Sequence, residues 1–383
     1  MTRYQILVAA LMLSASAYGM ASASEHSEAV VGYVFPQNRA LQAGEIDANK
    51  LTRINYAFAN IADGRITTGF TYDAENFAFL KSLKAQKPSL TVLVSVGGWL
   101  WSTNFSDVAF SANTRVTFID SVMEFLTRYD LDGLDIDWEY PGMPGAGHTF
   151  RSEDKQNFTL LLKELRARFD AQTARTGRRL YLTIAAGASD EFLAHTEMAK
   201  VQLYLDTVNL MTYDFYEPGS DAITGHNAPL FTNPNDPKHI AADSSVKAFE
   251  KAGVPAAKIL LGLPFYGHVW GQVAERDHGL YQAGKPIPNA YASFGVISTE
   301  MIGHGFDRFW DPRSSVPYLY SQEKQTFVSY DDAESIAGKC QYVVTQKLGG
   351  VMFWDYSSDP TGTLLKAIQK SFDKPPARST SSQ

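Results

Sequence analysis

Short apolar runs rich in β-branched residues alternate along the chain with longer stretches in which apolar positions recur with a helical period. Runs of the first kind predict buried strands, and stretches of the second kind predict amphipathic helices. The predicted strands are Ala29–Phe35, Arg53–Ala59, Leu90–Gly97, Leu131–Glu139, Leu180–Gly187, Leu205–Asp214, Lys258–Tyr266 and Gly350–Tyr356. The clearest predicted helices are Ser111–Arg128, Asp154–Thr173 and Asp243–Lys251. Ser111 and Ser152 are suitable N-terminal caps for the first two of these helices.

A strand followed by a helix, repeated along the whole chain, indicates an α/β fold with parallel strands. Eight such repeats predict a (β/α)8 TIM barrel. The alternative is an open, doubly wound sheet, which usually carries a G-x-G-x-x-G turn after its first strand. No such turn follows Ala29–Phe35, so the barrel is the predicted fold.

The longest gap between predicted strands separates the seventh from the eighth. It begins with several glycines and prolines and continues with two strand-like pieces, Tyr291–Ile297 and Pro317–Tyr320. We interpret residues 267–330 as a small α+β insertion. An insertion that follows a barrel strand lies on the face that carries the active site.

The two ends of the chain are predicted to lie outside the barrel. Residues 1–23 contain one charge, Arg3, an apolar stretch at residues 6–13 and a small-residue cleavage pattern at residues 21–23. This pattern is typical of a secretory signal, and its apolar stretch is too short for a membrane anchor. The predicted catalytic unit is residues 24–373, and the Pro- and Ser-rich residues 374–383 are predicted to be a disordered tail. We therefore expect a secreted protein.

Composition excludes several classes of protein. A chain with 45% hydrophobic and 20% charged residues is globular rather than disordered. The 34 basic and 41 acidic residues give a net charge of −7, which argues against binding to a nucleic acid backbone. The single cysteine, Cys340, excludes an internal disulfide framework and a Cys-rich zinc module. We interpret it as a small buried apolar residue.

The fourth predicted strand carries an unusual row of acids. Because a strand has a side-chain period of two, Asp135, Asp137 and Glu139 point to one side, whereas Ile136 and Trp138 point to the other. Buried charges cost several kcal/mol unless they are paired or used. We therefore expect the acids to face the barrel interior and the two apolar side chains to face the outer helices.

The chemistry of this row follows from electrostatics. Carboxyls about 7 Å apart along one strand cannot all ionise comfortably, so at least one proton is shared among them. Such sharing raises the pKa of a neighbour, as a general acid requires. Glu139 is nearest to the mouth of the barrel and Asp135 is deepest. The alternatives are a metal site or a structural cluster, but the 8 histidines are scattered, and we predict no metal and no other cofactor.

The row and three further motifs resemble those of glycoside hydrolase family 18, the chitinase family. Asp132, Asp135, Asp137 and Glu139 match its D-x-x-D-x-D-x-E signature. The other matching segments are Ser95–Gly98 for S-x-G-G, Met211–Asp214 for M-x-Y-D and Gly350–Asp355 for the eighth-strand motif with its floor tryptophan. The resemblance covers nearly all of residues 29–371, and the insertion resembles that of the bacterial and animal-type subfamily.

The resemblance implies substrate-assisted hydrolysis with retention of configuration. Glu139 would protonate the glycosidic oxygen, and the 2-acetamido carbonyl oxygen of the substrate would attack the anomeric carbon. Asp137 would orient the acetamido group and would share a proton with Asp135. The hydroxyl of Tyr213 would hydrogen-bond the acetamido carbonyl, and Asp214 would hold the sugar.

Aromatic residues gather at or just beyond the predicted carboxyl ends of the strands, where their flat faces can stack on pyranose rings. The substrate-binding residues predicted from these positions and from the motifs are Tyr33, Phe58, Gly98, Trp99, Tyr140, Met211, Asp214, Tyr266, His268 and Trp354. For Trp270, stacking on a sugar and ordinary core packing both stay open.

His268 departs from the family pattern, in which the strand-seven motif often reads Y-G-R rather than the Tyr266-Gly267-His268 of this chain. An arginine donates as a cation at any pH, whereas a histidine does so only when protonated. We therefore expect activity to fall earlier on the alkaline side than in a His268→Arg variant. The alternative is a neutral loop histidine with no such effect.

The leading hypothesis is a secreted chitinase that cleaves β-1,4 bonds between N-acetylglucosamine units of chitin and chitooligosaccharides. One alternative is an endo-β-N-acetylglucosaminidase that acts on glycoprotein glycans through the same acids. Another is a chitin-binding lectin without activity, although family lectins typically lack one of the ladder acids, which are all present here. No nucleic acid or membrane partner is predicted, and nothing requires more than a monomer.

Overall fold

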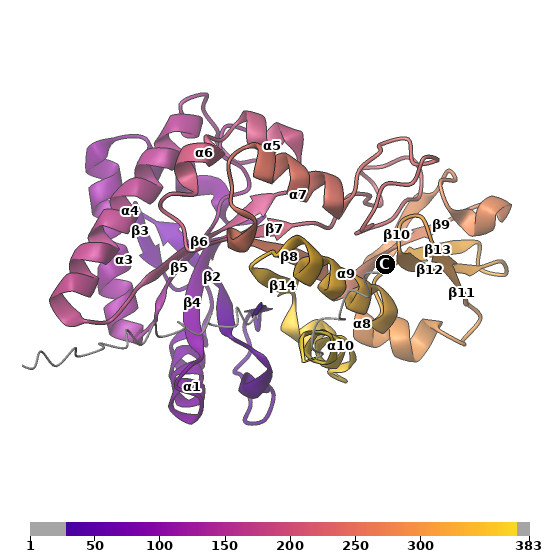
Figure 1. The fold of residues 1–383 in the computed structure, drawn as a ribbon, viewed down its shortest axis with the longest axis horizontal. Helices are drawn as coiled ribbons and strands as arrows, with labels where there is room; N and C mark the ends of the chain where they lie inside the picture. The colour runs from indigo at the N-terminus through magenta and orange to yellow at the C-terminus, as the bar shows by residue number, and fades with distance from the viewer. Residues whose placement is uncertain (1–27, 374–383) are drawn as a thin grey trace, which may run out of the picture.

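The computed structural model describes residues 28–373, so the predicted signal and the predicted tail lie outside the described residues. Within this range eight parallel strands form a closed barrel, because β1 pairs with both β14 and β2 (Figure 1). The barrel strands are β1 (Ala29–Val34), β2 (Arg53–Ala62), β4 (Thr91–Gly97), β5 (Gly133–Asp137), β6 (Tyr181–Gly187), β7 (Thr207–Met211), β8 (Ile259–Pro264) and β14 (Gly350–Trp354). A short strand, β3 (Arg65–Thr67), forms a hairpin with β2. The predicted TIM barrel is confirmed.

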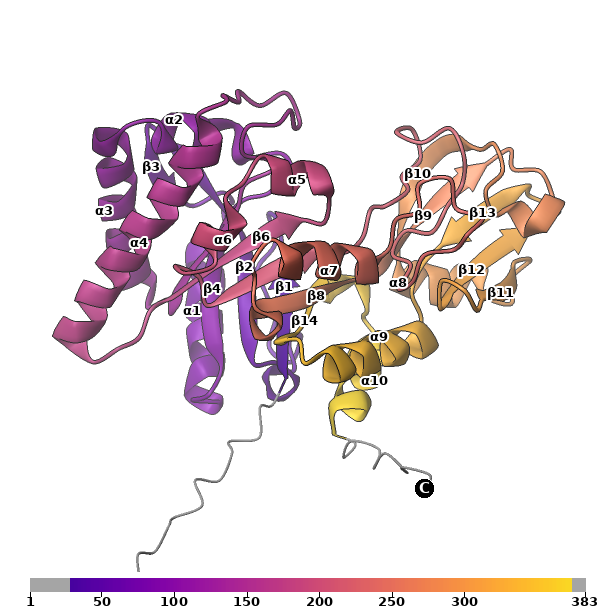
Figure 2. The same cartoon turned by 45° about the horizontal axis from the view of Figure 1, so that its top comes forward.

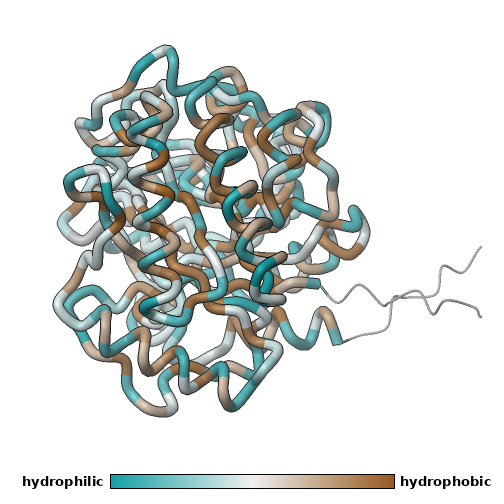
Figure 3. Tube along the Cα trace, turned by 90° about the vertical axis from the view of Figure 1, so that its left-hand side faces the viewer, coloured by the Kyte–Doolittle hydropathy of each residue, from teal (hydrophilic) through white to brown (hydrophobic). Residues whose placement is uncertain are grey.

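The strands alternate between two apolar environments. In β1, Val31 and Tyr33 belong to a small cluster inside the barrel, whereas Val30 and Val34 belong to the large core between strands and helices. This is the alternation that a two-residue period requires. In Figure 3 the hydrophobic segments lie toward the inside of the molecule, and many outer loops are hydrophilic.

Helices surround the barrel, and α3, α5 and α9 begin at a residue whose side chain caps the helix. The helices of the barrel layer are α1 (Asp73–Gln86), α2 (Phe105–Ala109), α3 (Ala112–Tyr129), α4 (Asp154–Thr176), α5 (Asp190–Ala194), α6 (Met198–Val201), α7 (Ala242–Lys251), α9 (Ala333–Gln346) and α10 (Thr363–Phe372). Ser111 caps α3, as predicted, by accepting a hydrogen bond from the Thr114 N–H. The predicted cap Ser152 is wrong, because its hydroxyl donates to Glu153 and α4 begins without a side-chain cap.

Two predicted strands end earlier than expected. The ladder of β5 ends at Asp137, so Glu139 lies beyond it, and β7 ends at Met211 rather than at Asp214. Asp214 has a φ of 57°, which is a left-handed conformation that a strand cannot continue. These early ends release both carboxylates from the sheet at the mouth of the barrel.

The segment between β8 and α9 forms a second, antiparallel sheet beside the barrel (Figures 1 and 2). Its strands are β9 (Tyr266–Gly271), β10 (Lys285–Ser293), β11 (Asp307–Asp311), β12 (Val316–Ser321) and β13 (Thr326–Ser329), in the order β10-β9-β13-β12-β11. Part of the predicted strand Tyr291–Ile297 is helical instead. The Ser293 side chain accepts from the Val296 N–H and starts α8 (Phe294–Val296), which continues as a turn of π-helix at Ile297–Met301.

The long loop between β7 and α7 joins this second sheet to the barrel. The N–H of Asn227 donates to Ser329 Oγ at 2.6 Å, and His226 Nε2 lies 3.0 Å from Asp311 Oδ2. Since only Phe265 separates β8 from β9, Tyr266 and His268 stand directly at the rim of the barrel.

The remaining sequence expectations concern burial. Cys340 is fully buried in the core, and burial raises the pKa of its thiol to about 12. It is therefore the inert apolar residue that was predicted. Among the described helices, none combines the length and the apolar character needed to cross a bilayer.

Candidate active site

Asp135 anchors the site from the interior of the barrel. It is fully buried and accepts hydrogen bonds from Tyr33 Oη at 2.8 Å, Ser95 Oγ at 2.7 Å, Asn209 Nδ2 at 3.0 Å and the hydroxyl of Thr183. Burial raises the pKa of Asp135, and the hydrogen bonds oppose this shift. Four donors occupy the four lone-pair positions of the carboxylate, so this arrangement holds Asp135 as an acceptor.

Asp137 lies above Asp135 and reaches the cleft. Its side chain is 4% exposed, and its Oδ1 has no hydrogen-bond partner among the described residues. Burial, followed by the charges of Glu139 and Asp135, raises the pKa of Asp137 well above its ordinary value. No hydrogen bond joins Asp135 to Asp137 within residues 28–373, so their shared proton stays a prediction. A buried polar atom without a partner is one that a ligand can satisfy.

Glu139 stands at the mouth of the barrel. Burial raises its pKa to about 7, a hydrogen bond with Tyr140 opposes this shift, and the charges of Asp214 and Glu217 add to it. A carboxyl with this pKa holds a proton in a substantial fraction of molecules near neutral pH, as a general acid must. As predicted, the neighbouring Trp138 points away from the barrel and stacks on Phe105 of α2, with ring centroids 5.2 Å apart.

Asp214 organises the wall formed by β7 and β9. Its Oδ1 accepts from Tyr266 Oη at 2.5 Å and from His268 Nε2 at 2.8 Å. Asp214, Glu217 and His268 offer possible metal ligands within 4.8 Å of one another. The Nε2 of His268 already donates to Asp214, and this hydrogen bond accounts for the arrangement. We therefore assign no ion to it.

Tyr213 offers an unused hydroxyl to the cleft. The atom nearest to its Oη as a hydrogen-bond partner is Met352 Sδ at 4.0 Å, and sulfur is a weak acceptor. Burial raises the pKa of Tyr213 well above its ordinary value, so the hydroxyl keeps its proton. The group is thus a donor that is free to bind a ligand oxygen.

Aromatic rings form the floor of the site. Trp354 stacks on Phe58, with centroids 5.5 Å apart and an interplanar angle of 22°, and its centroid lies 5.9 Å from that of Tyr33. Gly98 has a φ of 78°, and a Cβ there would lie 2.7 Å from Phe58 Cζ. Glycine at this position therefore allows the ring of Phe58 to approach the turn after β4.

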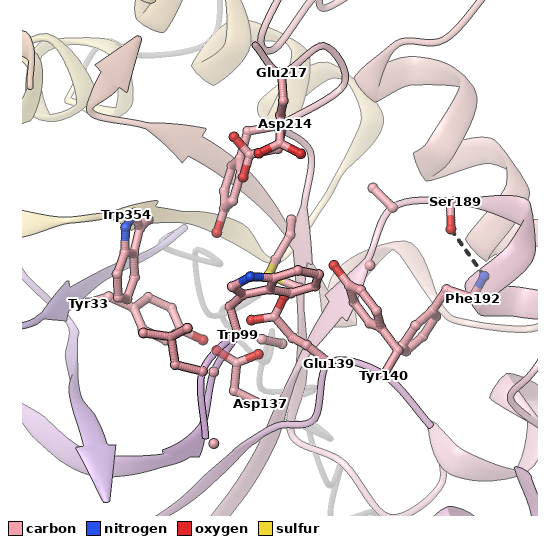
Figure 4. A pocket seen from close by; sticks show the side chains of 18 of the residues that line it. Tyr33, Trp99, Asp137, Glu139, Tyr140, Ser189, Phe192, Asp214, Glu217 and Trp354 are labelled. Carbon is pink, nitrogen blue, oxygen red and sulfur yellow. Dashed lines mark hydrogen bonds between the residues drawn. The ribbon is translucent and has the colours of Figure 1, made fainter. Parts of the chain in front are cut away.

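These groups line one cleft of about 1080 Å³. In Figure 4, Asp137 and Glu139 lie across the cleft from Asp214 and Glu217, and Trp354 and Trp99 lie between them in the view. Every predicted substrate-binding residue lines the cleft, as do Asp137, Glu139 and Tyr213. Asp135 is the exception among the predicted residues and lies beneath the cleft.

Several lining residues were not predicted from the sequence. Glu217 and Tyr291 come from the β7–α7 loop and from β10, and neither belongs to a motif that could reveal it. Tyr291 stacks on Tyr266 with centroids 4.5 Å apart. The sequence left the role of Trp270 open, and the structure assigns it to the core: it is fully buried, does not line the cleft and packs against Phe327 of β13.

Comparison with known proteins identifies the family to which this arrangement belongs. Residues 29–359 match glycosyl hydrolases family 18. The chain belongs to this family. It is 36% identical to chitinase A1 of Niallia circulans over an alignment of 405 positions, which spans 89% of this chain but only 58% of that protein. It is 34% identical to chitotriosidase-1 of Mus musculus over 319 residues, which cover 81% of this chain and 67% of the mouse protein.

A solved structure with the same fold is that of a family 18 N-acetylglucosaminidase from Paenibacillus barengoltzii. It superposes with a TM-score of 0.82 at 42% identity and covers 90% of this chain and 99% of that one. The prediction of a glycoside hydrolase of the chitinase family is therefore confirmed.

Proposed function

We propose that this chain hydrolyses β-1,4 bonds between N-acetylglucosamine units of chitin and chitooligosaccharides. The observation that carries the proposal is the pairing of Glu139 at the mouth of the barrel with Asp137 below it. Glu139 has a pKa of about 7, and Asp137 has a buried oxygen that lacks a partner. Two family relatives are named chitinase A1 and chitotriosidase-1, and these names point to the same substrate.

The position of the carboxyls favours substrate-assisted catalysis. In a two-carboxylate glycosidase the second carboxyl lies across the scissile bond from the first. Asp137 comes from the same strand as Glu139 and lies below it, so it is poorly placed for that role. Two carboxyls do lie across the cleft, but Asp214 is held by hydrogen bonds from Tyr266 and His268, and burial raises the pKa of Glu217, which disfavours its ionised form. The acetamido carbonyl oxygen of the substrate would instead attack the anomeric carbon while Glu139 transfers its proton to the leaving oxygen.

Three groups would stabilise this step. Asp137 would accept the acetamido N–H through its free Oδ1 and offset the positive charge of the oxazolinium intermediate. The Tyr213 hydroxyl would donate to the acetamido oxygen, and Asp214 would hold the sugar. Water would then attack the anomeric carbon from the side of the departed sugar, giving its proton back to Glu139 and retaining the configuration.

We also propose that the protein is exported through residues 1–23, that it acts as a monomer and that it falls in the subfamily with an insertion after the seventh barrel strand. The sequence pattern of residues 1–23 supports export. The sheet β9–β13 supports the subfamily, since Tyr266, His268 and Tyr291 deepen one wall of the cleft. A cleft of about 1080 Å³ that is lined with aromatic rings suits a linear polymer.

The test is to incubate the purified chain and its Glu139→Gln variant with chitotetraose and chitohexaose and to resolve the anomers of the products. We expect rapid release of β-anomeric chitobiose, which the variant abolishes. Release of single N-acetylglucosamine units would favour the activity named for the Paenibacillus barengoltzii relative. Binding without cleavage would support a lectin, and neither binding nor cleavage would direct the search to glycoprotein glycans.

A further inference from the structure

Ser102 lies outside the cleft but contacts the backbone of the general acid. It opens a 3-10 turn, Ser102–Asn104, between β4 and α2, and its side chain is fully buried. The N–H of Glu139 donates to Ser102 Oγ at 2.9 Å. The hydroxyl hydrogen in turn faces two carbonyl oxygens, that of Gly98 at 2.9 Å and that of Asp137 at 3.1 Å.

Only one of these three partners depends on Ser102. The Gly98 carbonyl also accepts from the Trp101 N–H at 3.1 Å, and the Asp137 carbonyl also accepts from the Gly98 N–H at 2.8 Å. Within residues 28–373 the Glu139 N–H has no other acceptor. Removal of the hydroxyl would therefore leave one part-buried donor without a protein partner, and that donor belongs to the residue that carries the reacting proton.

The need for such a contact follows from the end of β5. The sheet ladder holds the backbone only as far as Asp137, so neither neighbouring strand fixes Glu139. We propose that Ser102 is a positioning residue for the general acid and takes over where the ladder stops. The proposal rests on the proposed function in one respect, namely that Glu139 is the acid.

A purely structural role for a buried serine is the alternative, and the chain offers a matched control for it. Ser106 in α2 is also fully buried, and its hydroxyl donates to Asp154 Oδ1 at 2.7 Å. Neither Ser102 nor Ser106 lines the cleft. Replacement of either by alanine removes one buried hydroxyl, but only Ser102→Ala releases Glu139.

The experiment measures kcat and KM on chitotetraose for the wild type, Ser102→Ala, Ser106→Ala and Ser102→Thr. A small displacement of a catalytic group lowers the rate steeply, so we expect kcat of Ser102→Ala to fall roughly 10- to 100-fold. Its KM should change less than about twofold, because Ser102 does not itself line the cleft and every lining residue other than Glu139 keeps its contacts. Ser102→Thr, which keeps the hydroxyl, should recover most of the kcat, whereas Ser106→Ala should keep wild-type kcat.

An equal fall of kcat in both alanine variants would overturn the proposal, as would wild-type kcat in Ser102→Ala or a change confined to KM. If Ser102→Thr does not fold, the two alanine variants still decide the question.

If the wild type cleaves no chitooligosaccharide, amide hydrogen exchange still tests the contact between Ser102 and Glu139 independently of the proposed function. In protein labelled with ¹⁵N-glutamate, the Glu139 resonance is identified by its loss in Glu139→Gln. We expect its exchange to accelerate at least tenfold in Ser102→Ala and to be unchanged in Ser106→Ala, since loss of one hydrogen bond exposes this amide. Unchanged exchange in Ser102→Ala would refute the positioning contact whatever the substrate.

Discussion

His268 Nε2 lies 2.8 Å from Asp214 Oδ1, and this hydrogen bond ties β9 of the inserted sheet to the carboxylate at the end of β7. The bond requires only a hydrogen on Nε2, which a neutral imidazole tautomer also supplies. The hydrogen bond alone therefore does not require a positive charge on His268.

His268→Arg tests this relationship. The sequence alone led us to expect that the arginine variant would stay active to higher pH. The structure adds an opposing effect, because the charge of Asp214 helps to raise the pKa of Glu139 to about 7. A permanent cation beside Asp214 offsets that charge and lowers the pKa of Glu139. Since the acid must be protonated, we expect the alkaline limb of kcat/KM to move to lower pH, and superimposable pH profiles would contradict both arguments.

Glu217→Gln tests the same electrostatics from another residue. Glu217 is half-buried in the cleft, and its charge also raises the pKa of Glu139. Removal of the Glu217 charge should lower the pKa of Glu139. The alkaline limb of the kcat/KM profile should then move to lower pH by less than about one unit, while the slope of the acid limb stays unchanged. Glu124→Gln is the control, because Glu124 pairs with Arg65 on the surface and does not line the cleft. A shift of equal size in both variants would show that overall charge, not Glu217, is responsible.

The sequence predicts those parts of the site that follow from strand periodicity. The inward direction of Asp135 and Asp137 and the outward direction of Trp138 require only that β5 is a strand with one face in the barrel. The motif residues at the ends of β4, β7 and β14 follow because the carboxyl ends of parallel barrel strands meet at one face.

The parts that the sequence did not predict depend on contacts between distant segments. Trp270 lies in β9, and its burial depends on the pairing of β9 with β13, which no local pattern reveals. Glu217 reaches the cleft because the β7–α7 loop is fastened to the inserted sheet at Asn227 and Ser329. Ser102 binds Glu139 only because β4 and β5 are neighbours in the barrel.

Tyr213→Phe tests the free hydroxyl of the opposite wall. Among residues 28–373 its one hydrogen-bond contact is with Met352 Sδ at 4.0 Å, so the folded protein loses little when the hydroxyl is removed. If the hydroxyl donates to oxygen on which charge changes during the reaction, its loss should lower kcat roughly 10²- to 10³-fold. Tyr342→Phe is the control, because the Tyr342 hydroxyl donates to Asp243 and neither residue lines the cleft. A kcat that falls less than about tenfold in Tyr213→Phe would assign the hydroxyl to ground-state binding.

Gly98→Ala tests whether the aromatic floor depends on a glycine. Two effects act at this position: a φ of 78°, which strains any other residue, and a Cβ that would lie 2.7 Å from Phe58 Cζ. Gly64→Ala isolates the first effect, because Gly64 has a φ of 72° and no atom within 4 Å of the added Cβ. Both variants should lower the free energy of unfolding by about 1 kcal/mol or more in urea titrations.

Only Gly98→Ala should also change substrate binding. The added methyl group must push Phe58 away, and Phe58 stacks on Trp354 at 5.5 Å, so the floor on which a sugar would rest is displaced. We therefore expect the KM for chitotetraose to rise several-fold in Gly98→Ala and to stay at the wild-type value in Gly64→Ala. Equal KM values in the two variants would mean that backbone strain is the whole effect and that the contact between Gly98 and Phe58 does not shape the floor.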